Sequence, residues 1–506
     1  MKLMTPLKFA TCLVFLCTLT ASTSWAAEAD QKKNATASSP NVLLIVCDDL
    51  NSHVSPSGYQ DIITPNMERL AKSSMRFTRA YCQYPVCGPS RSSFLSGLYP
   101  ESTGVVDNTS DIRTVRPNTT TMPQWFKEHG YWTAGVGKIF HNTKTDPGEI
   151  AWHENHRFDN EWNPVVRPVQ EAFEKEHGSV DLEKNQKAWK AKLKELRKLA
   201  GGQTPPGYGP TTMSDAQHKD GKNARQIVKW LDEKSYGDKP FFMICGIQKP
   251  HVPYWAPQKY FDMYPPEKIV VSAVPENDWD DIPKAALVHR YTSFGFEAAK
   301  ENDSLRREYM QAYHACITFV DAQIGLVLDS LEKNGLEEDT IVILTSDHGY
   351  HLGEHFLWGK VTLFEVCARV PMVVRVPGRT PASSHTTGLV ELIDLFPTLC
   401  DLCDIDAPKE LQGQSFVSLL DDPKSSGKQF AYTVVSRGKQ LGRSIRSSRW
   451  RYAEWNTPEE NELYDLNQDP AEFKNLAKDP EMQMVVNRLR KVLRMKQTEA
   501  ASLRSN

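Results

Sequence analysis

The feature that most constrains the fold of this chain is a series of short, continuous apolar runs. They are residues 41–47, 131–137, 240–247, 340–345 and 370–375. Runs that are apolar at every position are typical of central strands in a parallel sheet, where both faces are covered. Helix-like segments lie between them, at residues 64–75, 121–130, 222–234 and 306–333. This alternation predicts an α/β fold with a large, mostly parallel sheet and helices on both faces.

The pattern changes after about residue 421. Short strand-like segments come first and a helix-like segment follows, at residues 430–435, 443–447, 449–455, 462–466 and 479–496. They predict a small antiparallel sheet packed with a helix. A mature chain of about 480 residues is long enough for two domains. We therefore expect a large α/β domain at residues 41–421 and a C-terminal α+β subdomain at residues 422–506.

Residues 151–210 interrupt the alternation with charged, helix-prone sequence and a loop rich in Gly and Pro. We interpret this stretch as an insertion in the large α/β domain. Its composition is typical of a solvated surface helix. A wall of the substrate entrance is the functional alternative.

The first residues have the pattern of a secretory signal peptide. Lys2 and Lys8 precede an apolar run at residues 9–19, and small residues surround a cleavage point after Ala26. The run is too short to cross a membrane, and no later run is long enough. We expect a signal peptide at residues 1–26, a disordered lead-in at residues 27–40, no membrane span in the mature protein, and a secreted, periplasmic or lysosomal location.

Charge and cysteine content exclude some classes of protein. The formal net charge is −3, or −5 without the two signal lysines, which argues against nucleic acid as a partner. An anionic ligand then needs a local basic pocket. Eight cysteines remain after the signal peptide, too sparse in this chain for a disulfide framework.

Acidic residues follow two of the predicted strands. Asp48 and Asp49 come directly after residues 41–47, and Asp347 and His348 follow residues 340–345. Ligands of open α/β sheets bind at the carboxyl ends of the strands, and carboxylates suit hard divalent cations. Both Asp48 and Asp49 can face one ion only if the chain turns there. These residues predict a cation site; the alternative is that each aspartate caps a following helix.

Basic residues follow the same strand ends. They are Lys138 and His141 after residues 131–137, Lys249 and His251 after residues 240–247, and Lys360 shortly after Asp347. Any one of them is more often an ordinary surface residue. Together, beside a cation site, they indicate a pocket for an anionic substrate.

One cysteine lies at a predicted helix N-terminus. Cys87 is followed by Pro89 and Arg91, and residues 90–98 have helical spacing. Free N–H groups at this end of a helix favour negative charge, and Arg91 adds a cation. A buried cysteine in a tight turn is the plain alternative.

This stretch resembles the signature of type I sulfatases, Cys-x-Pro-Ser-Arg, here residues 87–91, followed by Ser96-Gly97. Other motifs resemble the iduronate-2-sulfatase branch of that family: Lys-Pro-His-x-Pro at 249–253, Ser-Asp-His-Gly at 346–349 and Leu-Gly-Glu-His at 352–355. Glu-Leu-Tyr-Asp-Leu at 462–466 resembles the family's C-terminal subdomain. The resemblance spans nearly the whole mature chain and implies an alkaline-phosphatase-like fold.

The resemblance also implies a chemistry. In that family the cysteine is converted to formylglycine by a formylglycine-generating or sulfatase-maturing enzyme, and one Ca²⁺ is bound per chain. The implied metal-binding residues are Asp48, Asp49, Cys87, Asp347 and His348. Hard Ca²⁺ prefers oxygen ligands, and many relatives have Asn at the position of His348. The implied catalytic residues are Cys87, Arg91, Lys138, His141, His251 and Lys360.

The resemblance assigns roles to these residues. Arg91 and the cation activate a hydroxyl of hydrated formylglycine, and Lys138 and Lys360 hold the sulfate oxygens. His251 protonates the departing alcohol, and His141 takes the proton that lets sulfate leave.

The expected function is therefore a secreted sulfatase acting on a sulfated glycan, with a uronic acid (iduronate) 2-O-sulfate as the implied substrate. A phosphodiesterase or phosphonate-ester hydrolase of the alkaline phosphatase superfamily is the first alternative. A second metal-ligand set and a Ser or Thr nucleophile would favour this alternative, whereas Cys87 with Pro89 and Arg91 argues against it. A glycan-binding protein that has lost catalysis is the second alternative. Loss of Cys87, Arg91 or the aspartates would favour it, but all of them are present.

Overall fold

The computed structural model describes residues 39–141, 148–158, 166–180, 182–199, 207–287 and 302–503. The predicted signal peptide and almost all of the predicted lead-in lie outside the described residues.

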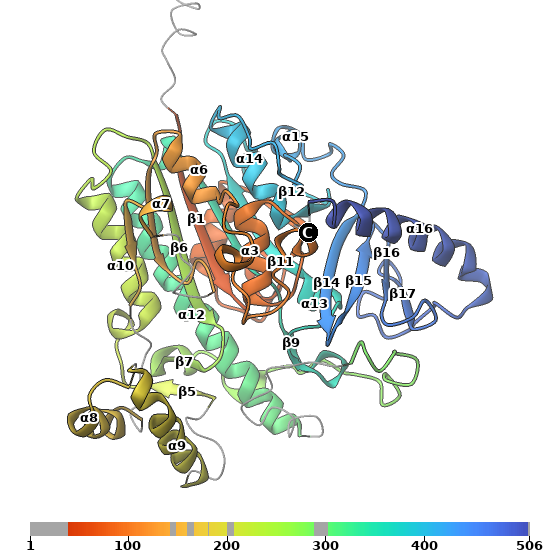
Figure 1. Cartoon of the computed structure of the whole chain (residues 1–506), viewed down its shortest axis with the longest axis horizontal. Helices are drawn as coiled ribbons and strands as arrows, with labels where there is room; N and C mark the ends of the chain where they lie inside the picture. The colour runs from red at the N-terminus through yellow and green to blue at the C-terminus, as the bar shows by residue number, and fades with distance from the viewer. Residues whose placement is uncertain are drawn as a thin grey trace, which may run out of the picture. The chain divides into compact units, whose positions relative to one another are not determined.

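One large mixed sheet organises the structure. Its strands lie in the order β12-β2-β11-β8-β1-β6-β3-β4, and β13 also pairs with β2 (Figure 1). The strands are β1 (Asn41–Asp48), β2 (Met75–Tyr81), β3 (Trp132–Gly137), β4 (Glu154–His156), β6 (Phe241–Pro250), β8 (Thr340–Ser346), β11 (Arg369–Arg375), β12 (Ser384–Thr386) and β13 (Val390–Glu391). All neighbours are parallel except β11, which runs antiparallel to β8 and to β2.

The central strand β1 shows why both faces of the sheet are apolar. Leu43 and Ile45 belong to one buried cluster, and Val42 and Leu44 belong to the other. Successive residues of a strand point to opposite faces, so a strand covered on both sides has to be apolar throughout. The fold predicted from the continuous apolar runs is confirmed.

Helices cover each face of the sheet. The first cluster is closed by α2 (Pro65–Lys72), α10 (Lys219–Asp232), α11 (Gln258–Phe261) and α12 (Asp303–Lys333). The second is closed by α3 (Cys87–Ser96), α5 (Ile112–Val115), α6 (Met122–Glu128), α7 (Gly148–Ala151), α14 (Leu395–Leu402) and α15 (Val417–Asp421). By length and composition α12 is apolar enough to cross a membrane, but 83% of its apolar window is buried inside the fold.

One predicted helix was too long. The interpretation of residues 64–75 as a helix was wrong at its end, because α2 stops at Lys72 and Met75 begins β2. The hydroxyls of Ser73 and Ser74 both donate to the Leu70 carbonyl, which satisfies the end of the helix. The sequence analysis therefore missed strand β2.

The C-terminal residues form the predicted antiparallel sheet. Strands β14 (Ala431–Arg437), β15 (Gln440–Arg446), β16 (Trp450–Glu454) and β17 (Asn461–Asp465) pair in chain order, and α16 (Gln483–Ala500) packs on β15 and β16. Their buried cluster includes Tyr84 and Val86, just before Cys87, and Val361, just after Lys360. The small sheet thus packs against two segments that carry predicted catalytic residues.

The predicted insertion contains two helices where it is described. They are α8 (Val166–His177) and α9 (Glu183–Leu199), which meet around Val180 and Trp189. Beyond it, β5 (Tyr208–Thr211) pairs with β7 (Tyr254–Pro257). The limits of the domains and of the insertion, and its place at a substrate entrance, stay predictions.

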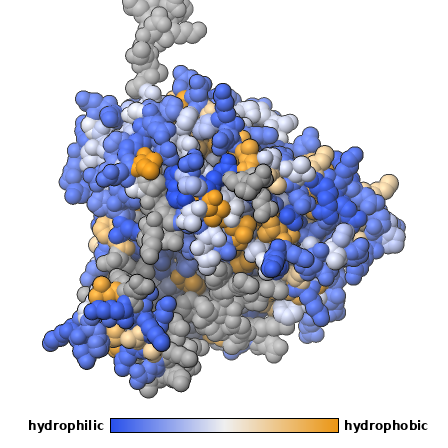
Figure 2. Space-filling view, in the orientation of Figure 1, coloured by the Kyte–Doolittle hydropathy of each residue, from blue (hydrophilic) through white to orange (hydrophobic). Residues whose placement is uncertain are grey.

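The remaining elements are short. They are α4 (Pro100–Thr103), α13 (Glu365–Ala368), the strand pair β9 (His351–Leu352) and β10 (Trp358–Gly359), and the 3₁₀ turns η1 (Ser55–Ser57), η3 (Asp215–Gln217), η4 (Pro266–Lys268), η6 (Glu337–Asp339), η7 (Glu354–Phe356), η8 (Leu392–Asp394) and η9 (Pro480–Met482). The eight described cysteines are free, buried thiols. Figure 2 shows a mostly hydrophilic face with hydrophobic residues in small groups.

Candidate active site

The candidate active site lies at the carboxyl ends of the central parallel strands. Asp48 is the last residue of β1, and Asp347 follows β8 directly. Asp49 has a φ of +65°, so the chain turns sharply after β1. Its N–H donates to Asp347 Oδ1 (3.2 Å), and its carbonyl accepts from the Tyr313 hydroxyl (2.6 Å). This turn brings the side chains of two successive aspartates to one place.

Cys87 is the first residue of α3 and is fully buried. The helix begins three residues earlier than predicted, because Val86 is extended and its carbonyl accepts the Ser90 N–H (3.0 Å). The Cys87 Sγ lies 3.2 Å from Lys360 Nζ and 3.4 Å from His348 Nε2. The thiol therefore faces cationic groups rather than apolar core.

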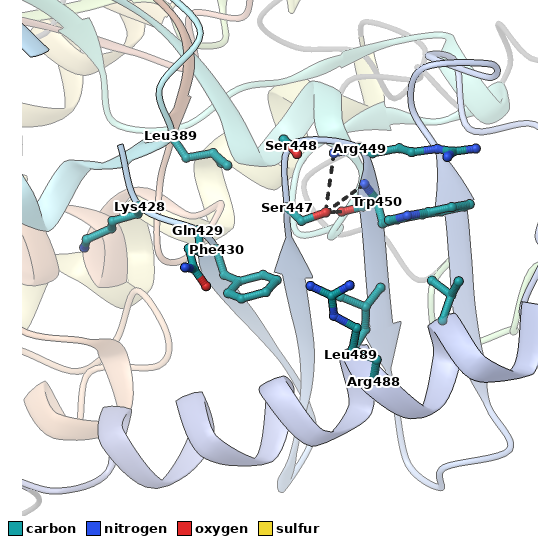
Figure 3. Close-up of a pocket in the computed structure, with 11 residues that line it drawn as sticks. Leu389, Lys428, Gln429, Phe430, Ser447, Ser448, Arg449, Trp450, Arg488 and Leu489 are labelled. Atoms are coloured by element: carbon teal, nitrogen blue, oxygen red, sulfur yellow. Dashed lines mark hydrogen bonds between the residues drawn. The ribbon is translucent and has the colours of Figure 1, made fainter. Parts of the chain in front are cut away.

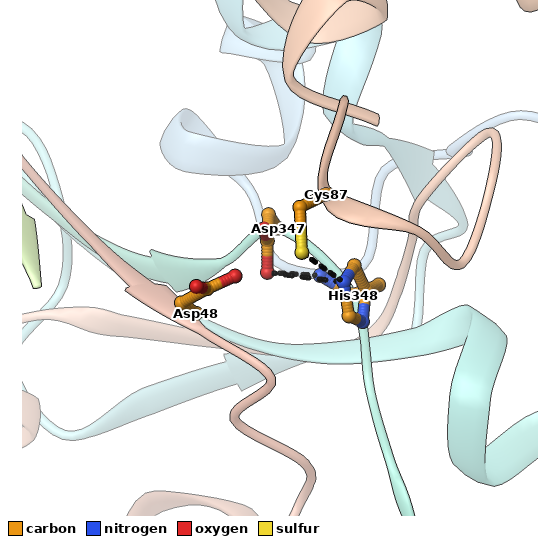
Figure 4. A group of neighbouring side chains, drawn as sticks. All are labelled: Asp48, Cys87, Asp347 and His348. Atoms are coloured by element: carbon orange, nitrogen blue, oxygen red, sulfur yellow. Dashed lines mark hydrogen bonds and ion pairs between the residues drawn. The ribbon is translucent and has the colours of Figure 1, made fainter. Parts of the chain in front are cut away.

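The side chains of Asp48, Cys87, Asp347 and His348 converge on one point (Figure 4). Their potential ligand atoms all lie within 4.8 Å of one another, and a second group of the same kind joins Asp49, Cys87 and His251. The Asp48 Oδ1 and Asp49 Oδ2 atoms are buried and have no hydrogen-bond partner. Buried carboxylate oxygens without partners are costly, and a divalent cation satisfies them. The described residues thus fit a metal ion.

His348 is oriented by the main chain. Its Nδ1 donates to the Gly349 carbonyl (2.9 Å), which leaves Nε2 facing Cys87 and 3.2 Å from Asp49 Oδ1. An imidazole held in this way is a possible metal ligand as well as a hydrogen-bond donor to an anion.

Arg91 holds the carboxylates together. Its Nε donates to Asp347 Oδ2 (2.8 Å), and its Nη2 lies 3.6 Å from Asp48 Oδ1. Its Nη1 donates to the carbonyls of Lys138 and Ile139. The guanidinium is fully buried and joins the ends of β1, β3 and β8. This geometry makes Arg91 a residue that positions Asp48 and Asp347.

Two lysines complete the cationic side of the site. Lys138 Nζ pairs with Asp48, and Lys360 Nζ lies 2.5 Å from Asp49 Oδ1. Lys249, which the sequence grouped with them, donates instead to the Pro253 carbonyl of its own loop.

The two predicted histidines also reach the cluster. His141 is among the groups that lower the pKa of the Cys87 thiol, and its buried Nδ1 has no hydrogen-bond partner. His251 Nε2 lies 3.9 Å from Asp49 Oδ2, and its side chain is 25% exposed. Every predicted catalytic and metal-binding residue is therefore brought to this one place.

The charges shift the pKa values of the buried groups. Burial raises the pKa of the Cys87 thiol, but Lys138 and Lys360 lower it more, so the net pKa lies well below its ordinary value. Burial raises the pKa of Asp347 to about 7. Burial alone lowers the pKa of His348, but the Asp347 carboxylate raises it to about 9. The site therefore stabilises an anion at residue 87.

Some supporting residues gave no usable signal in the sequence. Tyr313 matched the apolar spacing of a helix, yet its hydroxyl bonds both the Asp49 carbonyl and the Asn51 N–H. Asn108 accepts the Gly88 N–H (2.8 Å), next to Cys87. A Cβ on Gly88 would lie 2.8 Å from Asn108 Oδ1, so this contact needs glycine. Only the fold brings such distant residues together.

The fold is alkaline-phosphatase-like, and the side-chain cluster at its strand ends fits a metal ion. The sequence profile of the family described as Sulfatase matches residues 40–405, and that of N-sulphoglucosamine sulphohydrolase, C-terminal, matches residues 353–499. The chain belongs to the sulfatase family, and this membership supports hydrolysis of sulfuric esters.

Individual relatives agree with this assignment. The chain is 32% identical to a sulfatase of Formosa agariphila, covering 92% of this chain and 88% of that protein. It is 29% identical to human iduronate 2-sulfatase, covering 92% and 96%. A 2-O GAG sulfatase has the same fold, with a TM-score of 0.69 and 24% identity over 91% of this chain and 92% of that one. So does a phosphonate monoester hydrolase of Agrobacterium radiobacter, with a TM-score of 0.71 and 22% identity over 91% and 96%.

Proposed function

We propose that the protein removes sulfate from a sulfated saccharide, with a uronic acid (iduronate) 2-O-sulfate as its substrate class. The observation that supports this proposal most strongly is the buried Cys87 at the N-terminus of α3, beside carboxylates, lysines and histidines. The names of relatives support the substrate class, since they include iduronate 2-sulfatase and a 2-O GAG sulfatase. The signal-peptide pattern supports secretion.

Two groups complete the proposed site. A maturing enzyme converts Cys87 to formylglycine, which when hydrated supplies an oxygen nucleophile and a second hydroxyl for regeneration. Asp48, Asp49, Asp347 and residue 87, with His348 as a further candidate, hold one Ca²⁺, which supplies positive charge next to the sulfate. Calcium is the proposed ion because the carboxylate donors are hard oxygens.

The chain's own residues supply binding and proton transfer. Lys138 and Lys360 bind the sulfate oxygens, because both ammonium groups lie at the cluster and Lys360 also touches residue 87. His251 is the proton donor to the leaving alcohol, since its side chain is 25% exposed and its Nε2 lies 3.9 Å from Asp49 Oδ2, at the cluster. His141 is the base at residue 87, because it is among the groups that act on the Cys87 side chain and its buried Nδ1 has no hydrogen-bond partner.

The test is turnover by protein whose residue 87 is verified by mass spectrometry. The panel contains 2-O-sulfated uronic acids, 6-O- and N-sulfated glucosamine, choline sulfate, an aryl sulfate and a phenyl phosphonate, with Cys87→Ala as the inactive control. We expect the highest kcat/KM on the 2-O-sulfated uronic acids. A higher value on another sulfate refutes that substrate class. A higher kcat/KM on the phosphonate refutes the proposed sulfatase activity; one protein with the same fold is named phosphonate monoester hydrolase.

A further inference from the structure

A second pocket lies on the C-terminal sheet. Its volume is about 440 Å³, and it is formed by residues 428–430, the turn from Ser447 to Trp450 and one side of α16 (Figure 3). None of its residues belongs to the catalytic cluster. The volume lies within the range of small-ligand sites and holds roughly one or two sugar rings.

The turn that forms one wall of the pocket is fixed in place. The Ser447 hydroxyl accepts the Trp450 N–H (2.9 Å) and donates to the Trp450 carbonyl (3.2 Å). Arg449 donates to Asp465 from Nε (3.0 Å) and Nη2 (2.6 Å), and its guanidinium lies 4.5 Å from the Trp450 ring. The backbone of Trp450 is therefore fixed by the turn, and its half-buried indole packs against the anchored Arg449 guanidinium.

The pocket carries positive charge and no carboxylate among its lining residues. Lys428 is neutralised by Glu391 (2.6 Å) and Asp394 (2.5 Å). Arg488 and Gln429 are exposed, and within the described part of the chain neither has a hydrogen-bond or ion-pair partner. An available guanidinium and amide beside an aromatic ring match a sugar ring that carries an anionic group.

We propose that this pocket is an accessory site for a sulfated saccharide, which binds a second part of the polymer whose sulfate is cleaved at the catalytic cluster. The Trp450 ring stacks on the apolar face of a sugar, Arg488 binds its sulfate and Gln429 bonds a hydroxyl. This inference rests on the proposed function for its choice of ligand. The site raises the affinity for long substrates and does not take part in the chemistry.

Binding is measured with a heparin-derived hexasaccharide and its fully desulfated form, on full-length Cys87→Ala protein by titration calorimetry. Loss of a charge-assisted hydrogen bond lowers affinity about tenfold, and we expect this for Arg488→Gln. Trp450→Ala should have a comparable effect. Lys491→Gln, which removes an exposed charge from α16 outside the pocket, should bind like the parent. Equal affinity of Arg488→Gln and the parent overturns the site, as does equal binding of the desulfated hexasaccharide.

Kinetics on the matured enzyme separate this site from the proposed function. Arg488→Gln should raise KM for the hexasaccharide without changing kcat, and should leave turnover of an aryl sulfate unchanged. If the enzyme cleaves no saccharide sulfate but the calorimetric difference holds, the accessory site stands and the proposed function fails. If saccharides are cleaved and KM for the hexasaccharide is unchanged in Arg488→Gln, the accessory site is refuted alone.

Discussion

Substitution of Arg437, the last residue of β14, tests how the C-terminal sheet supports catalysis. Arg437 donates from Nη2 to the Val361 carbonyl (2.8 Å) and from Nε to the Ala285 carbonyl (2.7 Å). Val361 directly follows Lys360, and its φ of +75° is one that a β-branched residue adopts only when its surroundings impose it. We infer that Arg437 fixes the segment that aims Lys360 at residue 87.

The size of the effect follows from these contacts. A hydrogen bond from a charged donor contributes about 1.5–3 kcal/mol, and both of these bonds are only partly buried, so the lower end applies. Arg437→Ala should therefore reduce the free energy of unfolding by about 3 kcal/mol. About half of this free-energy loss comes from the bond to the Val361 carbonyl, which holds the segment that carries Lys360. Since about 1.4 kcal/mol is a factor of ten in rate, kcat should fall at least about tenfold on any sulfate ester.

Steady-state kinetics of matured protein, at a temperature well below its melting point, measure this loss. Arg443→Ala is the matched control, because Arg443 lies in β15, pairs with Glu101 and has no contact with Val361. Arg437→Lys should recover part of kcat by bonding one of the two carbonyls. The reasoning is refuted if Arg437→Ala keeps the parent kcat, or if the Arg443→Ala control loses as much.

Four further outcomes are expected. Cys87→Ala should fold with a near-parental melting temperature and show no turnover, and residual multiple turnover would disprove the role of residue 87. Chelation of the parent, or Asp347→Ala, should lower both activity and melting temperature because the remaining carboxylates then repel one another; a chelated enzyme with unchanged rate and melting temperature argues against a bound ion. His251→Ala should lose far more rate on a saccharide sulfate than on an aryl sulfate with an acidic phenol, while His141→Ala should lose equally on both; equal losses for His251→Ala contradict its role as the acid. Burial lowers the pKa of His53 to about 4, and it also lowers the pKa of His314, whose Nε2 lies 3.2 Å from His53 Nδ1. Between about pH 6.5 and 4 the unfolded chain therefore binds more protons at these histidines than the folded chain, so their contribution makes stability decrease as pH decreases. His53→Asn should flatten this dependence in urea titrations, and an unchanged slope would show that His53 is not its source.

Continuous apolar runs predicted the central strands well, because a strand covered on both faces has only one possible pattern. They failed for β2, at one side of the sheet, whose sequence Met75–Tyr81 contains two arginines and a threonine. Of its residues, Thr78 is exposed, and Arg76 and Arg79 are half-buried, so its apolar run is broken. A strand of that kind is recognised only when its partners β11, β12 and β13 are known.

The site was predictable where chemistry and strand ends coincide. Asp48, Asp347 and Lys138 follow recognisable strands, so the rule that ligands bind at strand ends placed them. Supporting contacts were not predictable, because residues such as Tyr313 and Asn108 act through hydroxyl and amide groups that any sequence contains. Their roles depend on contacts across 264 and 20 residues of sequence, respectively.

The complete burial of Cys87 limits when this protein can be activated. Its side chain has no exposed surface in the folded chain, and β1, β8 and the segment that carries Lys360 surround it. If Cys87 is converted to formylglycine as proposed, the oxidising enzyme has to bind the polypeptide on both sides of the thiol, which the packing of α3 against the sheet prevents in the folded chain. The proposed conversion would then have to precede folding of this region. The active fraction of a preparation would depend on how many chains are modified before they fold.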